Sequence, residues 1–150
     1  MDTIAIFHTK GGVAKSAVTV FLADFLASYE DKRVLVVDLD PQGSSSKALL
    51  GRDVLEAGFK KRRSLPQLLS KSIESGLSPH KDAIEAVLYK RPLRGNNTKR
   101  STYLAELSVL ATDRKGWRAF NEQINDLTQD SQGQFLDLLK DTLAEFEDDY

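Results

Sequence analysis

The 150-residue chain contains no cysteine, and it has no long uninterrupted apolar run. The absence of cysteine excludes a disulfide framework and thiolate metal ligands. Because no stretch of about 18 consecutive apolar residues is present, the sequence predicts no membrane-spanning helix. Neither sign of charge is in excess, since 21 basic and 22 acidic residues give a net charge of -1. The chain as a whole therefore has no electrostatic attraction to nucleic acid or to a membrane surface.

Proline and aromatic residues are also scarce, with 4 prolines and 8% aromatic residues, whereas 41% of the residues are hydrophobic and 29% are charged. A chain of this length and composition predicts one globular domain that is large enough to bury a core. Met1 leads directly into an apolar stretch without a basic and apolar signal segment, so we expect a cytoplasmic protein.

Residues 7–16 have the pattern of a phosphate-binding loop. They follow the apolar, β-branched run 3–7, which is typical of a buried strand in a parallel sheet. They precede a run of helical periodicity that continues to about Tyr29. Gly11 and Gly12 stand where the strand turns into the helix, and they let the backbone close around a ligand. Such a loop directs backbone N–H groups and the positive end of a helix at an anion.

Two polar residues complete this loop. Lys15 supplies a mobile charge for the β- and γ-phosphates of a nucleotide, and the Ser16 hydroxyl is placed to ligate Mg²⁺. The alternative is a glycine-rich turn with a solvent-exposed lysine. The order of strand, glycines, Lys-Ser and helix favours the phosphate-binding loop.

Two carboxylates follow a second apolar run at residues 34–37. Asp38 and Asp40 mark the carboxyl end of this predicted strand, where open α/β sheets bind their ligands. Their spacing places both side chains on one face of the strand. Two carboxylates so close together need a stabilising cation or hydrogen bonds, and Mg²⁺ with its waters would serve. The alternative is a pair of acidic residues at an exposed strand end.

Together these stretches resemble the two signatures of the ParA/MinD family of partition ATPases. The loop reads x-K-G-G-x-x-K-[ST], whereas the standard pattern G-x-x-x-x-G-K-[ST] would need glycine at Thr9 and Ala14. The second signature is D-x-D-P-Q-G. The resemblance implies the fold of a P-loop NTPase, a doubly wound parallel sheet with helices on both faces. It also implies that ATP and Mg²⁺ are the ligands.

The resemblance assigns roles to individual positions. The nucleotide-binding positions would be Lys10, Gly11, Gly12, Val13, Ala14, Lys15, Ser16 and Ala17. In the family, the residue at Lys10 reaches across a nucleotide-sandwiched dimer to the phosphates bound by the partner. Asp38 would hold the hydration shell of Mg²⁺ beside Ser16, and Asp40 would orient the attacking water. Lys10, Lys15 and Asp40 are therefore the expected catalytic residues.

Ala14 departs from the family pattern, which has glycine at this place. A positive φ at Ala14 would strain the backbone by about 1 kcal/mol or more, and a negative φ would not.

The remaining chain predicts mainly helices. We expect a short helix over 44–50, one from Leu65 to before Gly76, one from about Pro79 to before Pro92, and two with apolar stripes over 117–127 and 135–146. Residues 103–111 predict one further strand, and 90–100 predict a mobile basic loop. The basic run 60–63 is either a solvated surface or a contact for DNA.

One expected element has no counterpart in the sequence. A P-loop NTPase has a further apolar strand that ends in aspartate, the Walker B strand, next to the strand of the loop. Residues 107–112 lead into Asp113 without the apolar run that this strand requires. We therefore expect residues 1–150 to be the N-terminal part of a single P-loop ATPase domain. The strands at 3–7 and 34–37 would then lack a shared neighbour.

The favoured hypothesis is an ATP-dependent dimerising switch ATPase that acts in plasmid or chromosome partitioning. The resemblance implies an ATP-dependent homodimer, a centromere-binding adaptor protein and nonspecific DNA as partners, with the DNA-contacting surface mostly outside this chain. Hydrolysis by this chain is expected to be weak or absent. One alternative is a carrier ATPase of the nitrogenase iron protein or arsenite pump type, which the lack of cysteine disfavours. Another is a truncated, non-hydrolysing nucleotide-binding regulator. A MinD-like membrane role is disfavoured because the final helix is acidic.

Overall fold

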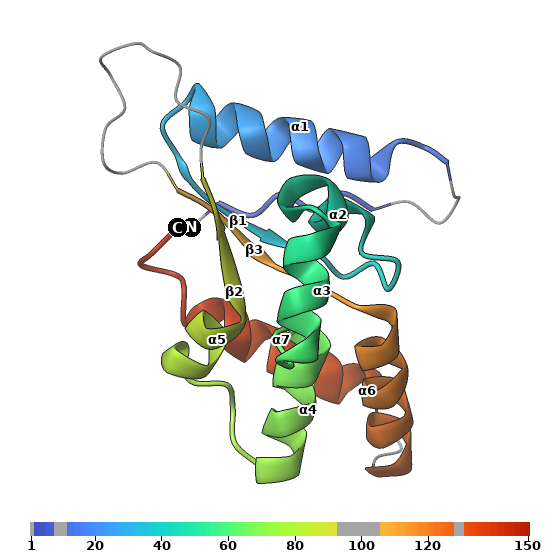
Figure 1. Cartoon of the computed structure of the whole chain (residues 1–150). Helices are drawn as coiled ribbons and strands as arrows, with labels where there is room; N and C mark the ends of the chain where they lie inside the picture. The colour runs from blue at the N-terminus through green and yellow to red at the C-terminus, as the bar shows by residue number, and fades with distance from the viewer. Residues whose placement is uncertain (1, 8–11, 93–105, 128–130) are drawn as a thin grey trace.

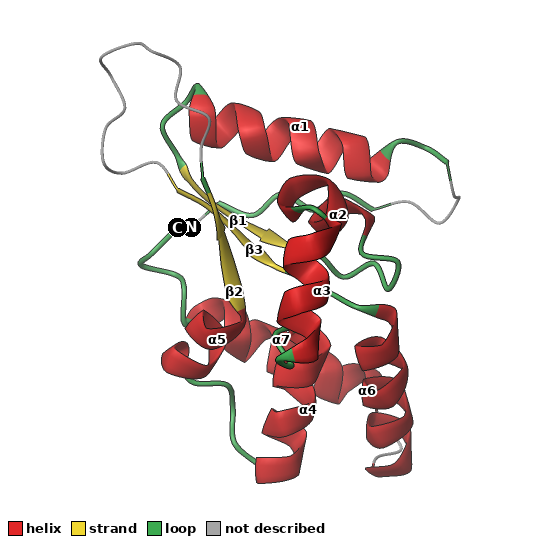
Figure 2. Cartoon of the chain, viewed as in Figure 1, coloured by secondary structure: helices red, strands yellow, loops and turns green. Residues whose placement is uncertain are grey.

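The structure, a computed structural model, describes residues 2–7, 12–92, 106–127 and 131–150. Within these residues, helices surround a small sheet (Figures 1 and 2). The elements in chain order are α1 (Lys15–Ser28), β1 (Arg33–Val37), α2 (Ser44–Leu50), α3 (Arg52–Lys60), α4 (Leu65–Ser75), α5 (Lys81–Val87), β2 (Leu88–Arg91), β3 (Glu106–Leu110), α6 (Arg114–Leu127) and α7 (Ser131–Ala144).

The sheet of the described residues has the strand order β1-β3-β2. β1 and β3 are parallel, with Arg33 opposite Glu106 and Val37 opposite Leu110. β2 is antiparallel to β3, and Leu88 lies opposite Leu110. An antiparallel edge strand on an otherwise parallel sheet is common in α/β folds. The predicted α/β class is confirmed, with a mixed sheet in place of an all-parallel one.

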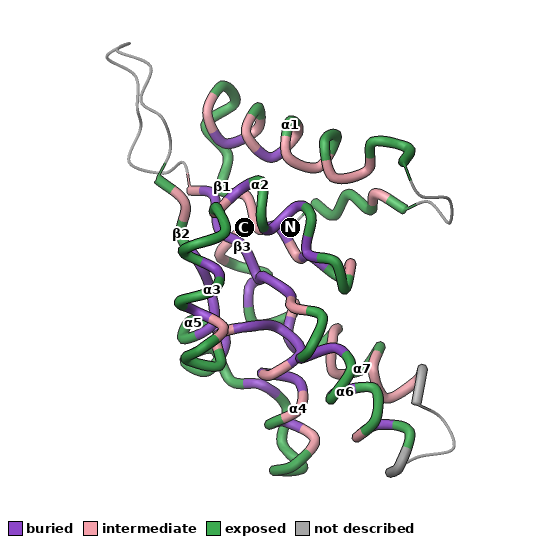
Figure 3. Tube along the Cα trace, turned by 45° about the vertical axis from the view of Figure 1, so that its right-hand side comes forward, coloured by how far each residue is buried: buried purple, intermediate pink, exposed green. Residues whose placement is uncertain are grey.

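Two apolar clusters lie on opposite faces of this sheet, because side chains along a strand alternate in direction. Val36, Leu107 and Val109 pack in one cluster with residues of α1, α2 and α3. Leu35 and Leu110 belong to the other cluster, together with residues of α4, α5 and α6. Figure 3 shows the buried trace running through the strands between these two groups of helices. The sheet is therefore covered on both faces, as predicted.

The predicted strand over residues 3–7 is wrong. This segment is not assigned to a strand, and the side chains of Ile4 and Phe7 are 62% and 83% exposed. A buried strand needs hydrogen-bonded neighbours at its edges. In the described part of the chain no strand lies between residues 2–7 and β1, and cavities lie there instead. This arrangement agrees with the expectation that the two segments lack a shared neighbour.

The helices follow the sequence pattern in part. α6 begins before the predicted residue 117, and α7 is shifted toward the N-terminus of the predicted range 135–146. α1, α2 and α4 lie where they were predicted, and β3 falls within the predicted strand. α3 was not predicted. α5 ends at Val87, earlier than predicted, because Leu88–Arg91 forms β2. The predicted mobile loop is therefore wrong at Lys90 and Arg91, and its residues 93–100 lie outside the described residues.

Candidate functional site

The predicted phosphate-binding loop meets α1 in an unusual backbone conformation. Gly12 has φ +75°, and Ala14, the N-cap of α1, has φ +60° and ψ +19°. Ala14 is thus in the left-handed region, where the sequence pattern of the family has glycine. An alanine in this region carries a strain of about 1–2 kcal/mol. Lys10 and Gly11 lie outside the described residues.

The N-terminus of α1 can accept an anion. Ala14 makes no side-chain cap hydrogen bond, and the first turn contains no acidic residue. The first N–H groups of a helix have no partner within the helix, and the helix dipole adds partial positive charge there. Lys15 and Ser16 are the first two residues of this turn.

Four of the predicted site residues line one cavity of about 820 Å³. Lys15 and Ser16 reach it from α1, and Asp38 and Asp40 reach it from the chain that follows β1. Ser45 of α2 also lines it and was not predicted. Gly12, Val13, Ala14 and Ala17 are not among the residues that line it. A concave site with a few converging polar groups is the usual form of a ligand pocket.

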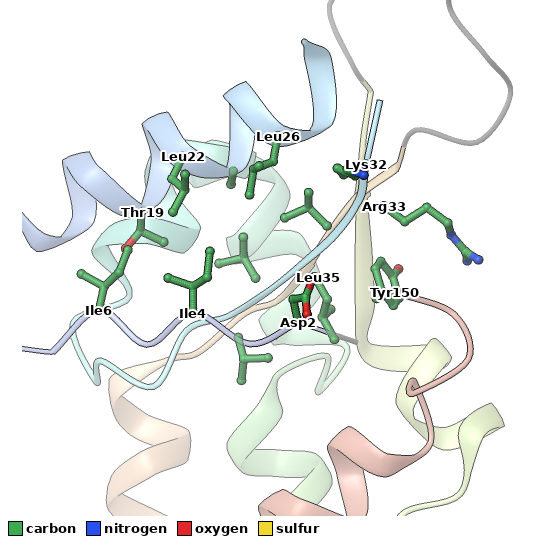
Figure 4. Close-up of a pocket in the computed structure, with 14 residues that line it drawn as sticks. Asp2, Ile4, Ile6, Thr19, Leu22, Leu26, Lys32, Arg33, Leu35 and Tyr150 are labelled. Atoms are coloured by element: carbon green, nitrogen blue, oxygen red, sulfur yellow. The ribbon is translucent and has the colours of Figure 1, made fainter. Parts of the chain in front are cut away.

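An adjoining cavity of about 560 Å³ is mainly apolar. Figure 4 shows Leu22 and Leu26 of α1 pointing toward Ile4 and the N-terminal segment, with Leu35 of β1 beside it. Tyr150 lines the far end of this cavity. The two cavities share Ile4, Ile6 and Leu35 among the residues that line them, so both lie between residues 2–7 and β1.

Tyr150 links the C-terminal residues to the sheet. Its hydroxyl donates to Glu106 Oε1 at 3.0 Å, and the guanidinium of Arg33 lies 5.1 Å from its ring centre. Burial, with the nearby negative charge of Glu106, raises the pKa of Tyr150 to about 12. The phenol is therefore neutral in the folded protein under ordinary conditions.

Asp38 is buried, with 5% of its surface exposed, and both of its carboxylate oxygens accept hydrogen bonds. Its Oδ2 accepts hydrogen bonds from the backbone N–H of Ser46 at 2.8 Å and from the Ser46 hydroxyl at 2.6 Å. Its Oδ1 accepts from the backbone N–H of Asp40 at 3.2 Å. Buried carboxylates are stable only when they are paired in this way. The carboxylate thus joins the end of β1 to the first turn of α2.

Asp40 begins a tight turn that packs against the chain at the end of β3. Its Oδ1 accepts from Gln42 N–H at 2.9 Å, and its carbonyl accepts from Gly43 N–H at 2.7 Å. Gly43 has φ +58°, and a Cβ there would lie 2.9 Å from the carbonyl oxygen of Thr112. Only glycine fits this position, so the turn that carries Asp40 has little freedom to shift.

The oxygen groups around the cavity fit Mg²⁺. The Ser16 hydroxyl and the carboxylates of Asp38 and Asp40 are hard donors, which this ion prefers. Among the described residues there is no group of three or more His, Cys, Asp and Glu side chains that could enclose a metal. Ser16 and Asp38 would therefore hold an ion that keeps several of its waters and that neutralises phosphate charge.

The basic run at 60–63 divides into two parts. Arg63 is structural, because its Nη2 donates to Leu88 O at 2.7 Å and its guanidinium lies 4.6 Å from the ring centre of Tyr89. Lys60, Lys61 and Arg62 are exposed.

Among the described residues, no helix is both long and apolar enough to cross a membrane.

Comparisons with known proteins identify the family of the chain. A family model described as an AAA domain, AAA_31, matches residues 1–150. The chain is 50% identical over 46 residues to the chromosome-partitioning ATPase Soj of Thermus thermophilus, and 52% identical over 46 residues to the sporulation initiation inhibitor protein Soj of Bacillus subtilis. Each match covers 31% of this chain and 18% of the relative.

A third relative is named for a different role. The maintenance of carboxysome distribution protein A of Gloeobacter kilaueensis is 54% identical over 43 residues, which is 29% of this chain and 19% of that protein. The matched segments thus span less than a fifth of the length of these curated relatives. No solved structure matches the chain. The match over all 150 residues and the similarity of the N-terminal portion show that the chain belongs to the AAA_31 family of AAA domains, as a ParA/Soj-like member with an α/β P-loop fold.

Proposed function

We propose that this chain is the ATP-binding part of a partition ATPase, a switch that dimerises when ATP is bound. The observation that supports it most directly is the cavity that Lys15, Ser16, Asp38 and Asp40 share. Two segments, the first turn of α1 and the chain that follows β1, contribute these groups, which suit the binding of Mg²⁺ and a triphosphate and the orientation of a water. The local identity to Soj proteins supports the same proposal.

Each residue has a defined task in this proposal. The ammonium group of Lys15 and the N–H groups at the start of α1 neutralise and orient the phosphates. Ser16 and Asp38 hold Mg²⁺, directly or through its waters. Asp40 orients the attacking water. Lys10 acts on the nucleotide of the partner subunit, so each ATP site is complete only in a dimer.

The proposal includes one further strand of the domain, between residues 2–7 and β1. The space there is lined by Leu22 and Leu26 of α1 on one side, and the larger cavity also reaches Leu139 and Leu143 of α7. A strand in this position would be apolar on both faces, as strands of a parallel sheet covered by helices are. We propose that residues 1–150 form the N-terminal part of one such domain, and that hydrolysis without the strand is weak.

A nucleotide-binding experiment tests the proposal. Isothermal titration with ATP and Mg²⁺ should show binding that Lys15→Ala abolishes. Lys71→Ala, at an exposed position of α4, is the matched control and should bind like the unsubstituted chain. If ATP does not bind, or if Lys15→Ala and Lys71→Ala bind equally well, the proposal is wrong.

The partners belong to the same proposal. We infer an ATP-dependent homodimer, a centromere-binding adaptor protein and nonspecific DNA, on the strength of the local similarity to partition proteins. Sizing chromatography with ATP and with ADP tests the first of these. Self-association that requires ATP supports the switch, and ATP binding without self-association favours a non-hydrolysing regulator.

A further inference from the structure

The three consecutive serines at the start of α2 have different environments. Ser44 is exposed, whereas Ser45 and Ser46 are buried. Ser46 is fully buried, and both its N–H and its hydroxyl donate to Asp38 Oδ2. Ser45 lines the candidate cavity without touching Asp38 in this way. The serine that contacts the site carboxylate is therefore the one that is hidden from the cavity.

These hydrogen bonds decide which part of Asp38 remains available. An ionised carboxylate has about four acceptor positions, two on each oxygen. Ser46 occupies both positions of Oδ2, and Asp40 N–H occupies one position of Oδ1. Among the hydrogen bonds of the described residues, none occupies the second acceptor position of Oδ1. The carboxylate is thereby fixed in rotation, with Oδ1 as its remaining acceptor for a ligand.

The same contacts also fix Asp40. Its backbone N–H is bound to Asp38 Oδ1, and its turn is confined by Gly43 against Thr112. A rotation of the Asp38 carboxylate would break the contact to Asp40 N–H. Ser46 therefore acts on both acidic residues although it lies eight positions after Asp38 in the sequence.

We propose that Ser46 is a positioning residue of the magnesium-nucleotide site, which holds Asp38 so that Oδ1 faces the metal-bound waters and Asp40 keeps its place. This inference rests on the proposed function. It assigns to Ser46 a task that is specific to binding in the presence of Mg²⁺. The phosphate contacts of Lys15 and of the α1 N-terminus do not depend on it.

The test compares ATP affinity with Mg²⁺ and with EDTA for serine variants of the full chain. Ser46→Ala should weaken binding about tenfold in Mg²⁺ and less than twofold in EDTA. Ser44→Ala removes an exposed hydroxyl from the same turn and should change neither affinity. Ser46→Thr keeps the hydroxyl and should restore most of the affinity in Mg²⁺. Melting curves by circular dichroism establish that each variant is folded at the temperature of the titration.

A second variant covers the case in which Ser46→Ala does not fold. Ser46→Cys has a slightly larger side chain and retains a weak donor, and it should lose affinity in Mg²⁺ to a smaller extent. Equal losses in Mg²⁺ and in EDTA, or the same affinities as Ser44→Ala, would overturn the inference. The proposed function survives that result if ATP binding still depends on Lys15. If the unsubstituted chain binds no ATP, both proposals fail.

Discussion

Replacing Ala14 by glycine should stabilise the protein, although glycine in general destabilises a folded chain. Ala14 has φ +60°, and an L-residue in this region carries a strain of about 1–2 kcal/mol. Glycine removes the strain but gives the unfolded chain more freedom, which costs about 0.4–1 kcal/mol. Ala14 is exposed, so its methyl group contributes little buried area. The free energy of unfolding should therefore rise by about 0.5–1 kcal/mol.

Ala17 provides a matched control three residues further along the chain. It is also exposed, but it lies inside α1 with a helical backbone. Glycine there relieves no strain and should lower the free energy of unfolding by about 0.5–1 kcal/mol. The two substitutions are chemically identical, so their difference in sign isolates the backbone conformation of Ala14.

Urea denaturation followed by circular dichroism measures both variants, at low micromolar concentration and without nucleotide. For a chain of this length, 1 kcal/mol corresponds to a shift of about 2–4 °C in the melting temperature. A loss of stability in Ala14→Gly that equals the loss in Ala17→Gly would refute the reasoning. It would mean that Ala14 adopts an ordinary negative φ in solution.

Three further predictions concern other parts of the fold. Gly43→Ala should destabilise the protein by about 1–3 kcal/mol more than Gly76→Ala. Both glycines have positive φ, but only at Gly43 would an added Cβ contact a neighbour, the carbonyl oxygen of Thr112. Equal losses of stability in urea denaturation would contradict this prediction. Burial raises the pKa of Tyr150 to about 12, above its ordinary value of 10.0, so stability should fall as the pH rises from about 10 toward 12. Tyr150→Phe should show a smaller fall over this range, and identical pH profiles would contradict the prediction. The exposed side chain of Phe7 beside the free edge of β1 should make the chain self-associate or melt early. Phe7→Glu should reduce self-association in sizing chromatography. A monomer that unfolds in a sharp, reversible transition at all concentrations would contradict this prediction.

Local patterns in the sequence were sufficient to predict α1, α2 and α4 and four of the residues that line the cavity. The periodicity after Lys15 placed α1, and the Gly51 and Gly76 stops placed the ends of α2 and α4. The two-residue spacing of Asp38 and Asp40 put both at one strand end. These features depend on interactions between residues close in the chain, which is why they can be read from the sequence.

Features that depend on distant neighbours were not predicted. Gly58 lies inside α3, where a Cβ would lie 1.8 Å from the hydroxyl oxygen of Tyr89, so the packing of Tyr89 against α3 requires a glycine there. The apolar residues before Arg91 fit a helix and a strand equally well, and these residues form the strand β2 because they pair with β3. Residues 3–7 have the composition of a buried strand but lack a paired neighbour among the described strands.

The contact between Ser46 and Asp38 could not be read from the sequence either. The three serines at 44–46 predict a helix cap, but the N-cap of α2 is Gly43 and the serines form the first turn of the helix. The sequence does not indicate which of their hydroxyls turns inward. The turn at Gly43 decides this, because it brings α2 back over the end of β1.

The central claim is that the loop before α1 and the two carboxylates after β1 together bind a magnesium nucleotide. The most direct measurement is a titration of the chain with ATP and Mg²⁺, repeated with Asp40→Ala and Lys15→Ala. We predict saturable binding that Lys15→Ala removes, whereas Asp40→Ala keeps binding but has no residual hydrolysis. Absence of ATP binding by the unsubstituted chain, or binding that is indifferent to Lys15, would contradict the claim.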